Sequence, residues 1–234
     1  MATRRTDAPD PLRGVSFSLE TIDGRLALVA AHLPKFKPLR CDWTAPEIRR
    51  RIAAGKRAPL PRAIGLHKAT EPLSVLDATA GMGRDGFVLA ALGARVTMVE
   101  RQPLFAALLR DAHRHALADP QWRETAERIE LIEADAAAVL ASGRRWDVVH
   151  LDPMYPHRDK QALPGKDMQF LRELTGGDVD AGTLLEPALR AARRRVVVKR
   201  PSGAVTLSGR TPSFQLQATQ TRYDVYLPMS HCAD

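Results

Sequence analysis

The chain has 234 residues, of which 44% are hydrophobic, and it carries a formal net charge of +8. This composition excludes a disordered protein, and the length suffices for one α/β domain with a smaller extension. No apolar run approaches the roughly 20 residues of a membrane-spanning helix, and the polar start of the chain lacks the apolar stretch of a secretion signal. We therefore expect a cytoplasmic protein without membrane association. The excess of basic residues favours a polyanionic partner such as nucleic acid.

The two cysteines, Cys41 and Cys232, lie far apart in the sequence. A cytoplasmic protein keeps such residues as free thiols. No CxxC pair and no cluster of cysteine with histidine suggests a metal site, so no metal is expected.

Residues 1–70 are predicted to form a small α+β extension that begins with a hairpin. Two apolar segments, 17–20 and 26–30, flank the dipeptide Asp23-Gly24. Apolar segments on both sides of such a dipeptide are typical of a strand–turn–strand unit.

A basic helix is predicted to follow the hairpin. Thr44 is expected to be its N-cap, and the helix should stop at Gly55. Pro59 and Pro61 are expected to break the chain after it. Basic residues occupy the exposed face of this helix and the segment behind it: Arg49, Arg50, Arg51, Lys56, Arg57 and Arg62.

Residues 71–234 alternate apolar strands with helices, which indicates βαβ units and a parallel sheet. Residues 193–195, three arginines, are expected to cap the last of these helices. Strands are expected at 75–78, 95–99, 129–132, 147–151 and 196–199, with two more at about 214–219 and 222–227. The last two are joined by a short turn, so they must be antiparallel. The predicted fold is α/β and Rossmann-like, with a mostly parallel seven-stranded sheet and a C-terminal antiparallel hairpin. This is the architecture of class I S-adenosylmethionine (SAM)-dependent methyltransferases.

A glycine-rich turn follows the first strand of this predicted domain. Gly81 and Gly83 let the backbone approach a ligand closely, and amide groups at the next helix N-terminus can hold the methionine carboxylate of SAM. Asp77 can bind the amino end of the methionine. Glu100 ends the second strand, where it can accept hydrogen bonds from both ribose hydroxyls, and Asp135 ends the third strand, beside the expected adenine. Acids at three successive strand ends favour a SAM site over solvated loop residues.

The glycine spacing alone leaves an NAD-dependent oxidoreductase open as an alternative. The NAD fingerprint is G-x-G-x-x-G, and Gly81, Gly83 and Gly86 satisfy it. The order of the acids and the motif after the fourth strand argue against this alternative.

The motif Asp152-Pro153-Met154-Tyr155-Pro156 directly follows the fourth strand. It resembles the [Asp/Asn]-Pro-Pro-[Tyr/Phe] motif of amino-group methyltransferases, with Met154 in place of the second proline. The Asp152 carboxylate and a carbonyl near Pro153 can accept hydrogen bonds from the two N–H groups of an amine, which orients its lone pair. Tyr155 can stack on an extruded base. These residues are the predicted catalytic group.

Four segments carry long motifs, namely Asp77-Ala78-Thr79-Ala80-Gly81-Met82-Gly83-Arg84-Asp85, Glu100-Arg101, Leu151-Asp152-Pro153-Met154-Tyr155-Pro156-His157 and Arg195-Val196-Val197-Val198-Lys199-Arg200-Pro201. Together they resemble the ribosomal RNA small subunit methyltransferase J family, from about residue 40 to the C-terminus. The resemblance implies SAM-dependent methylation of the exocyclic N2 of a guanine in small-subunit ribosomal RNA. It also implies SAM contacts at Arg84, Asp85, Glu100, Arg101, Asp135, Ala136 and Asp152.

The expected partner is small-subunit ribosomal RNA, either naked or within the assembled small subunit. Phosphates beside a flipped base would lie at the carboxyl edge of the sheet, where the fourth and fifth strands end. RNA contacts are expected at Arg57, His157, Arg158, Lys160, Lys199 and Arg200.

Two further alternatives are weighed against catalysis on RNA. One is a non-catalytic RNA-binding protein on a relic methyltransferase fold. The other is a DNA adenine methyltransferase, but such enzymes usually carry a separate target-recognition domain, for which this chain has little room.

Overall fold

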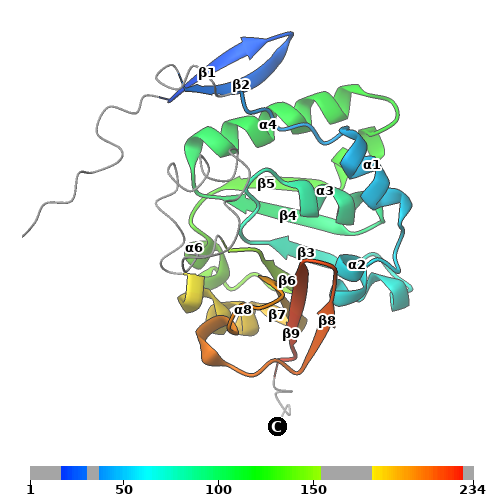
Figure 1. Ribbon diagram of the computed structural model, residues 1–234, viewed down its shortest axis with the longest axis vertical. Coiled ribbons are helices and arrows are strands. Elements are labelled where there is room, and N and C mark those ends of the chain that lie inside the picture. Colours follow the sequence, from blue (N-terminus) through cyan, green and yellow to red (C-terminus); the bar gives the residue numbers. More distant parts are fainter. Residues whose placement is uncertain (1–16, 31–36, 154–180, 229–234) are drawn as a thin grey trace, which may run out of the picture.

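A computed structural model describes residues 17–30, 37–153 and 181–228 of the chain. Its main feature is a seven-stranded sheet with the strand order β5-β4-β3-β6-β7-β9-β8 (Figure 1). The first five strands in this order are parallel, and β9 and β8 join antiparallel. The predicted fold is therefore confirmed. The strands are β3 (Ser74–Asp77), β4 (Arg95–Glu100), β5 (Ile129–Glu133), β6 (Trp146–Leu151), β7 (Ala192–Pro201), β8 (Phe214–Gln217) and β9 (Thr221–Tyr226).

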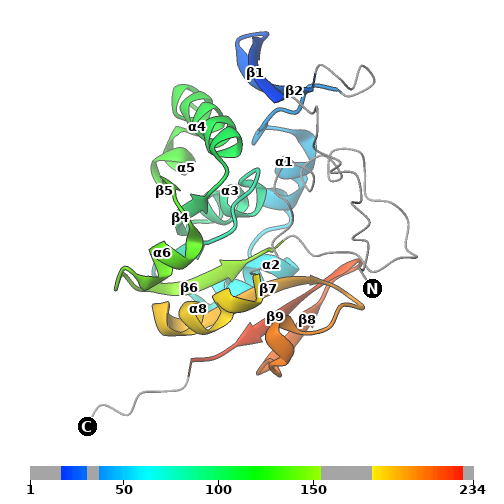
Figure 2. The ribbon, with the colours of Figure 1, turned by 90° about the vertical axis from the view of Figure 1, so that its left-hand side faces the viewer.

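The sheet separates two hydrophobic clusters. One includes residues of α3 (Arg84–Ala91), α4 (Pro103–Ala118) and α5 (Arg123–Glu127), and the other includes residues of α6 (Ala136–Ala141) and α8 (Leu185–Ala191) (Figure 2). In β3, Val75 belongs to the first cluster and its neighbour Leu76 to the second, because successive strand residues point to opposite faces. Burial on both faces explains why the central strands read as unbroken apolar runs.

Strand β7 begins earlier than the sequence indicates. Helix α8 ends at Ala191, and the next residue, Ala192, already has an extended backbone with φ −83° and ψ 135°. The prediction that residues 193–195 cap a helix is therefore wrong. Arg194 is exposed at the start of the strand, and its Nε lies 3.3 Å from Oδ1 of Asp147.

The N-terminal hairpin is confirmed. Strands β1 (Phe17–Ile22) and β2 (Arg25–Ala30) form a separate two-stranded sheet beside α4 (Figure 1). Asp23 and Gly24 both have positive φ, 52° and 73°, as a two-residue hairpin turn requires. The backbone N–H of Leu26 donates to Asp111 of α4 over 3.0 Å, which attaches the hairpin to the main body.

Two short helices, α1 (Pro46–Ala53) and α2 (Pro59–Ile64), connect the hairpin to the sheet. Thr44 does not cap α1, because its N–H and its hydroxyl both donate to Oδ1 of Asp42, over 2.9 and 2.8 Å. Neither Pro59 nor Pro61 breaks the chain. Both stand in the first turn of α2, where a missing N–H costs no helical hydrogen bond.

The described part of residues 1–70 shares a core with residues 71–234. Trp43, Ile48 and Ile64 are buried in the same cluster as α3. The ring of Trp43 stacks on that of Phe87 with centroids 4.9 Å apart. The segment before the sheet therefore packs directly behind the helix that follows the glycine-rich turn.

Candidate active site

The turns after β3 and β6 lie side by side. Both strands are central and run parallel, so their carboxyl ends meet at one edge of the sheet. Ala78 donates its N–H to the carbonyl of His150 over 3.0 Å, and Asp152 donates its N–H to Oγ1 of Thr79 over 2.7 Å. The glycine-rich turn and the start of the Asp152 motif are thus joined by direct hydrogen bonds.

Glycine is required at position 83. Its φ is 65°, and a Cβ there would lie 2.7 Å from a methyl of Leu109 and 3.0 Å from the ring of Trp43. Gly83 is also the N-cap of α3, whose first N–H groups have no partner within the helix. These amides, with exposed Arg84 beside them, can hold a carboxylate. The position fits the predicted methionine carboxylate.

The third glycine of the apparent NAD fingerprint serves packing. A Cβ at Gly86 would lie 2.5 Å from Cε of Met98 on β4 and 3.1 Å from Oδ2 of Asp77. Gly86 therefore allows α3 to lie against the sheet, which accounts for the glycine without a dinucleotide.

The glycine-rich turn is held from behind by two residues that the sequence did not single out for the site. The carbonyl of Met82 accepts hydrogen bonds from Nε1 of Trp43 and from Sγ of Cys41, each over 3.0 Å. Burial raises the pKa of Cys41 to about 12, so its thiol remains a donor. Cys41 is a free cysteine, as expected, but it supports the turn.

Glu100 ties the end of β4 to the same turn. Its Oε2 accepts from the N–H of Gly81 over 2.9 Å, and its Oε1 accepts from the N–H of Gln102 over 2.7 Å. The carboxylate is therefore fixed at the place where a SAM ribose is expected.

The ends of β4 and β5 also meet at this edge. An oxygen of Asp135 lies 3.8 Å from a guanidinium nitrogen of Arg101. The other oxygen of Asp135 caps α6 by accepting from Ala137 over 2.8 Å, and Ala136 is buried beside it. The structure thus brings together Arg101, Asp135 and Ala136, three of the expected SAM contacts.

Asp77 carries a buried carboxylate oxygen that fits a ligand. The residue is 2% exposed, and its Oδ1 makes no hydrogen bond to any residue that the structure describes. Burial raises the pKa of Asp77 to about 6. Because a buried unpaired oxygen is costly, a cationic donor such as the SAM ammonium would be well placed here.

A cluster of charges connects the two turns. The Lys199 ammonium lies 2.7 Å from Oδ2 of Asp152 and 3.0 Å from Oδ2 of Asp85. Asp85 also lies 2.5 Å from a nitrogen of Arg51 and 3.4 Å from Nε2 of His150. Burial alone would raise the pKa of Asp85, but these neighbours, Lys199 first, hold it well below its usual range. The carboxylate of Asp85 is therefore bound by the other charged side chains of this cluster.

The structure corrects one predicted RNA contact. Arg200 is 1% exposed, and its guanidinium donates to the carbonyl of Val205 over 2.6 Å, so it does not lie at the pocket mouth. Lys199 faces inward to two carboxylates. Consecutive strand residues point to opposite faces, so both could not line the same rim.

Two predicted catalytic residues follow β6 in the sequence. Pro153 is buried, and the side chain of Asp152 is 39% exposed. Arg57, a predicted RNA contact, is exposed in the segment that follows α1 in the sequence. The remaining predicted residues, Tyr155, His157, Arg158 and Lys160, lie outside the described residues.

The described ranges are residues 17–30, 37–153 and 181–228. Within them, no three or more His, Cys, Asp and Glu side chains are grouped so that they could bind a metal ion. Likewise, none of the helices there has the length and apolar character needed to span a membrane.

The sheet order, the turn at Gly83 and the acid at the end of β4 define a class I SAM-dependent methyltransferase. A family model described as "Putative SAM-dependent methyltransferase" matches residues 12–228. The chain belongs to the ribosomal RNA small subunit methyltransferase J family within this class. This membership overturns the NAD-dependent alternative.

Relatives and a solved structure agree with this assignment. The chain is 47% identical to ribosomal RNA small subunit methyltransferase J of Thioalkalivibrio sulfidiphilus, over 86% of this chain and 80% of the relative. It is 43% identical to the protein of that name from Shewanella loihica, over 90% of this chain and 83% of that relative. A SAM-dependent methyltransferase of Neisseria gonorrhoeae superposes with a TM-score of 0.72 at 33% identity, covering 94% of this chain and 86% of that one.

Proposed function

We propose that this enzyme transfers the methyl group of SAM to the exocyclic N2 amine of a guanine in small-subunit ribosomal RNA. The names of its relatives support the RNA substrate. The observation that carries the proposal is the 2.7 Å hydrogen bond between Asp152 and Thr79, which joins the cofactor turn to the amine-binding motif. The proposed partner places the enzyme in the cytoplasm.

The residues near Asp152 supply positioning. SAM, when bound, supplies an electrophilic methyl carbon. The guanine N2 is a poor nucleophile because its lone pair is delocalised into the ring. The Asp152 carboxylate and the Pro153 carbonyl accept its two N–H bonds and direct the lone pair toward that carbon. With SAM bound, the nitrogen–carbon bond would form as the carbon–sulfur bond breaks, the sulfur would leave as a neutral thioether, and the amine would give up one proton to water or to Asp152.

The cofactor is proposed to lie across the turn from Gly81 to Asp85. Its carboxylate would face Arg84 and the first amides of α3, and its ammonium would face Asp77. Its ribose would meet Glu100. Arg101, Asp135 and Ala136 would surround its adenine.

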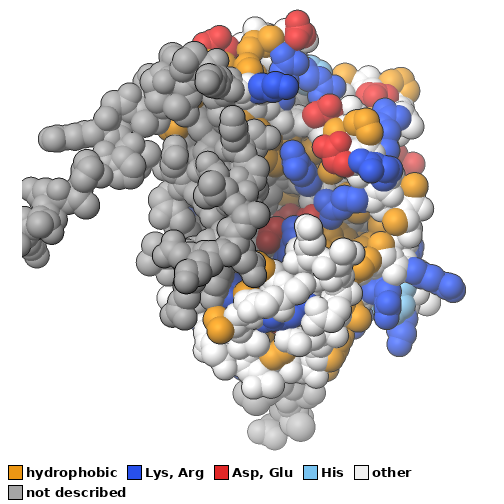
Figure 3. All heavy atoms as spheres, in the orientation of Figure 1, with side chains coloured by type: hydrophobic (Ala, Val, Ile, Leu, Met, Phe, Trp, Pro, Cys, Tyr) orange, Lys and Arg blue, Asp and Glu red, His pale blue; other side chains and the backbone are white. Residues whose placement is uncertain are grey.

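RNA is proposed to reach the site over the face formed by α1 and α2. Lys and Arg side chains gather on this side of the molecule (Figure 3). Burial lowers the pKa of His67, and the neighbouring charges of Lys68, Arg62 and Arg195 lower it further. Such a face attracts phosphates without reading sequence. The exposed residues of the face are Arg49, Arg50, Lys56, Arg57, Arg62 and Lys68.

Mapping of ribosomal RNA from a deletion strain tests this function. We expect one guanine of the small-subunit RNA to lose its N2 methyl group, and a plasmid copy of the gene to restore it. A plasmid copy with Asp152→Ala should fail to restore it. An unchanged methylation map would contradict the proposal, and restoration by Asp152→Ala would favour a non-catalytic RNA-binding role.

A further inference from the structure

Lys199 lies between the cofactor turn and the catalytic loop. It stands on β7, and its neighbour Val198 pairs in parallel register with Leu151, the residue before Asp152. Its ammonium spans Oδ2 of Asp152 at 2.7 Å and Oδ2 of Asp85 at 3.0 Å. Three segments far apart in the sequence therefore meet at one nitrogen.

Asp152 is held at two points. Its N–H donates to Oγ1 of Thr79, and its Oδ2 accepts from Lys199. With one carboxylate oxygen occupied, Oδ1 is the oxygen that can face an incoming amine. A carboxylate held by a single backbone bond could rotate about its side-chain torsions and lose this aim.

We infer that Lys199 is a positioning residue for methyl transfer: its ammonium fixes the Asp152 carboxylate so that one oxygen is presented to the substrate amine. This inference rests on the proposed function, because it needs an amine as the acceptor. It assigns to Lys199 a role different from phosphate binding.

The ammonium is itself held in place. Asp85, the other partner of Lys199, is 8% exposed and is bound from α1 by Arg51 and from β6 by His150. A flexible lysine gains a defined position only when its partners are fixed, and the low exposure of Asp85 strengthens their attraction. The positional order of Lys199 thus comes from Asp85.

The charge of Lys199 balances the cluster. The carboxylates of Asp77, Asp85 and Asp152 interact electrostatically with the Lys199 ammonium or with one another. Burial alone would lower the pKa of Lys199, but Asp152 and Asp85 raise it above its usual value, so the group stays an ammonium ion. Within the part of the chain that the structure describes, the other charged or titratable neighbours include His150 from β6, Arg51 from α1 and Tyr223 from β9.

The test compares Lys199→Met and Lys199→Arg with the wild type in a steady-state methyl-transfer assay on small-subunit RNA. Lys199→Met keeps the length of the side chain but removes the charge. We expect kcat to fall by about 10²–10³-fold, as for loss of a preorganised electrostatic contact, with the KM for SAM changed by less than roughly threefold. Lys199→Arg keeps the charge and should recover part of kcat. The matched control is Lys37→Met, at an exposed lysine that has no part in the proposed site, which should leave kcat unchanged.

A pH profile separates positioning from a general structural role. Without the ammonium, the carboxylates of the cluster bind protons more readily, so the acid limb of kcat should move to higher pH in Lys199→Met. Lys199→Arg should keep the wild-type limb. If Lys199→Met does not fold, Lys199→Arg alone carries the test. It should then show a lower kcat than the wild type and an acid limb of the pH profile at the wild-type position.

Two outcomes overturn the inference. One is a folded Lys199→Met variant with wild-type kcat and pH profile. The other is a variant with unchanged kcat, weaker RNA binding and a flatter salt dependence, which would make Lys199 a phosphate contact. A wild-type enzyme that methylates no guanine would instead remove the proposed function, and the inference with it.

Discussion

Nε1 of Trp43 donates a hydrogen bond to the carbonyl of Met82 over 3.0 Å, so a residue from before the sheet supports the turn expected to hold SAM. Trp43→Phe keeps a ring against Phe87 and removes this donor. We expect the free energy of unfolding to fall by about 1–3 kcal/mol and the affinity for SAM to weaken. Denaturant titration and calorimetry with SAM measure the two effects. Unchanged affinity in a folded variant would show that the turn does not need this support.

Gly81 and Gly83 should differ in their tolerance of alanine. Both have positive φ, but a Cβ at Gly81 meets nothing within 4 Å, whereas one at Gly83 meets Leu109 at 2.7 Å. Gly81→Ala should therefore cost about 1–2 kcal/mol from backbone conformation alone. Gly83→Ala should cost about 1–3 kcal/mol more because it overpacks the core. Thermal or chemical denaturation of both variants gives the comparison, and equal losses would speak against the packing described here.

Asp77 should make stability depend on pH. Its pKa is raised by burial to about 6 in the folded protein, so between about pH 4 and pH 6 the unfolded chain releases this proton before the folded chain does. Ionisation therefore destabilises the fold as pH rises through this window, by on the order of 3 kcal/mol at most. Asp77→Asn removes this dependence.

Chemical denaturation of the wild type and Asp77→Asn at pH 4 and pH 7 isolates the contribution. The stability of the variant relative to the wild type should increase with pH. The affinity of the wild type for SAM should also increase from pH 5 to pH 7, as the carboxylate becomes available to the ammonium. A pH-independent difference between the proteins would argue against a buried titrating group.

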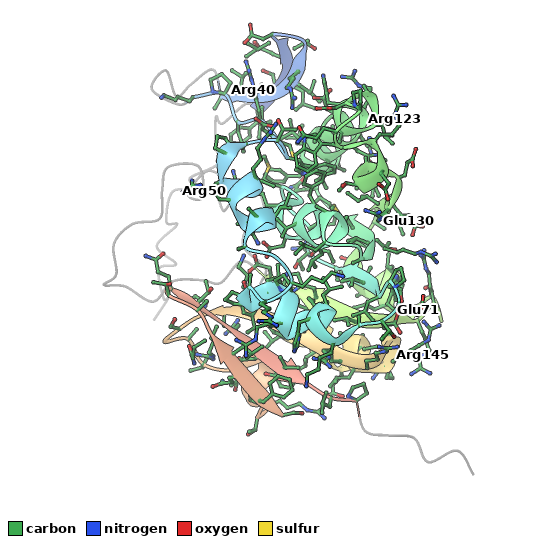
Figure 4. All side chains as sticks on the ribbon, turned by 90° about the vertical axis from the view of Figure 1, so that its right-hand side faces the viewer. Arg40, Arg50, Glu71, Arg123, Glu130 and Arg145 are labelled. Atoms are coloured by element: carbon green, nitrogen blue, oxygen red, sulfur yellow. The ribbon has the colours of Figure 1, made fainter. Side chains whose placement is uncertain are left out.

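The basic face formed by α1 and α2 should control the affinity for RNA and should not change the rate of methyl transfer on bound RNA. Arg50→Ala combined with Arg57→Ala should weaken binding and reduce the salt slope by about one for each lost phosphate contact. Arg123→Ala is the matched control, since Arg123 and Arg50 project from different sides of the molecule (Figure 4). A fluorescence titration of RNA at several salt concentrations measures the slope. Equal effects of the double variant and the control would remove this face from the proposal.

Much of the fold could be predicted because its signals are local. Buried strands read as apolar runs, and Asp23-Gly24 marks a hairpin within a few residues. The line of acids at the strand ends followed from topology, since parallel strands end at one edge. The glycine-rich turn could be placed for the same reason.

The contacts of the site required distances across the chain. The pairing of Lys199 with Asp85 joins residues 114 positions apart, and the sequence could place Lys199 at the correct edge without showing which way it points. An arginine at a strand end usually reaches solvent, so the sequence does not show that the Arg200 guanidinium is buried and donates to the carbonyl of Val205. The contact of the half-buried Lys199 with two acids appears only in the folded structure.

The proposed reaction requires that a methyl group held by the turn after β3 face an amine held by Asp152. Transfer of labelled methyl from SAM to small-subunit RNA, measured for the wild type and Asp152→Asn alongside SAM affinity, tests it most directly. We predict that Asp152→Asn binds SAM within a few-fold of the wild type but transfers methyl at least about 10²-fold more slowly. Transfer at the wild-type rate by Asp152→Asn would contradict the claim.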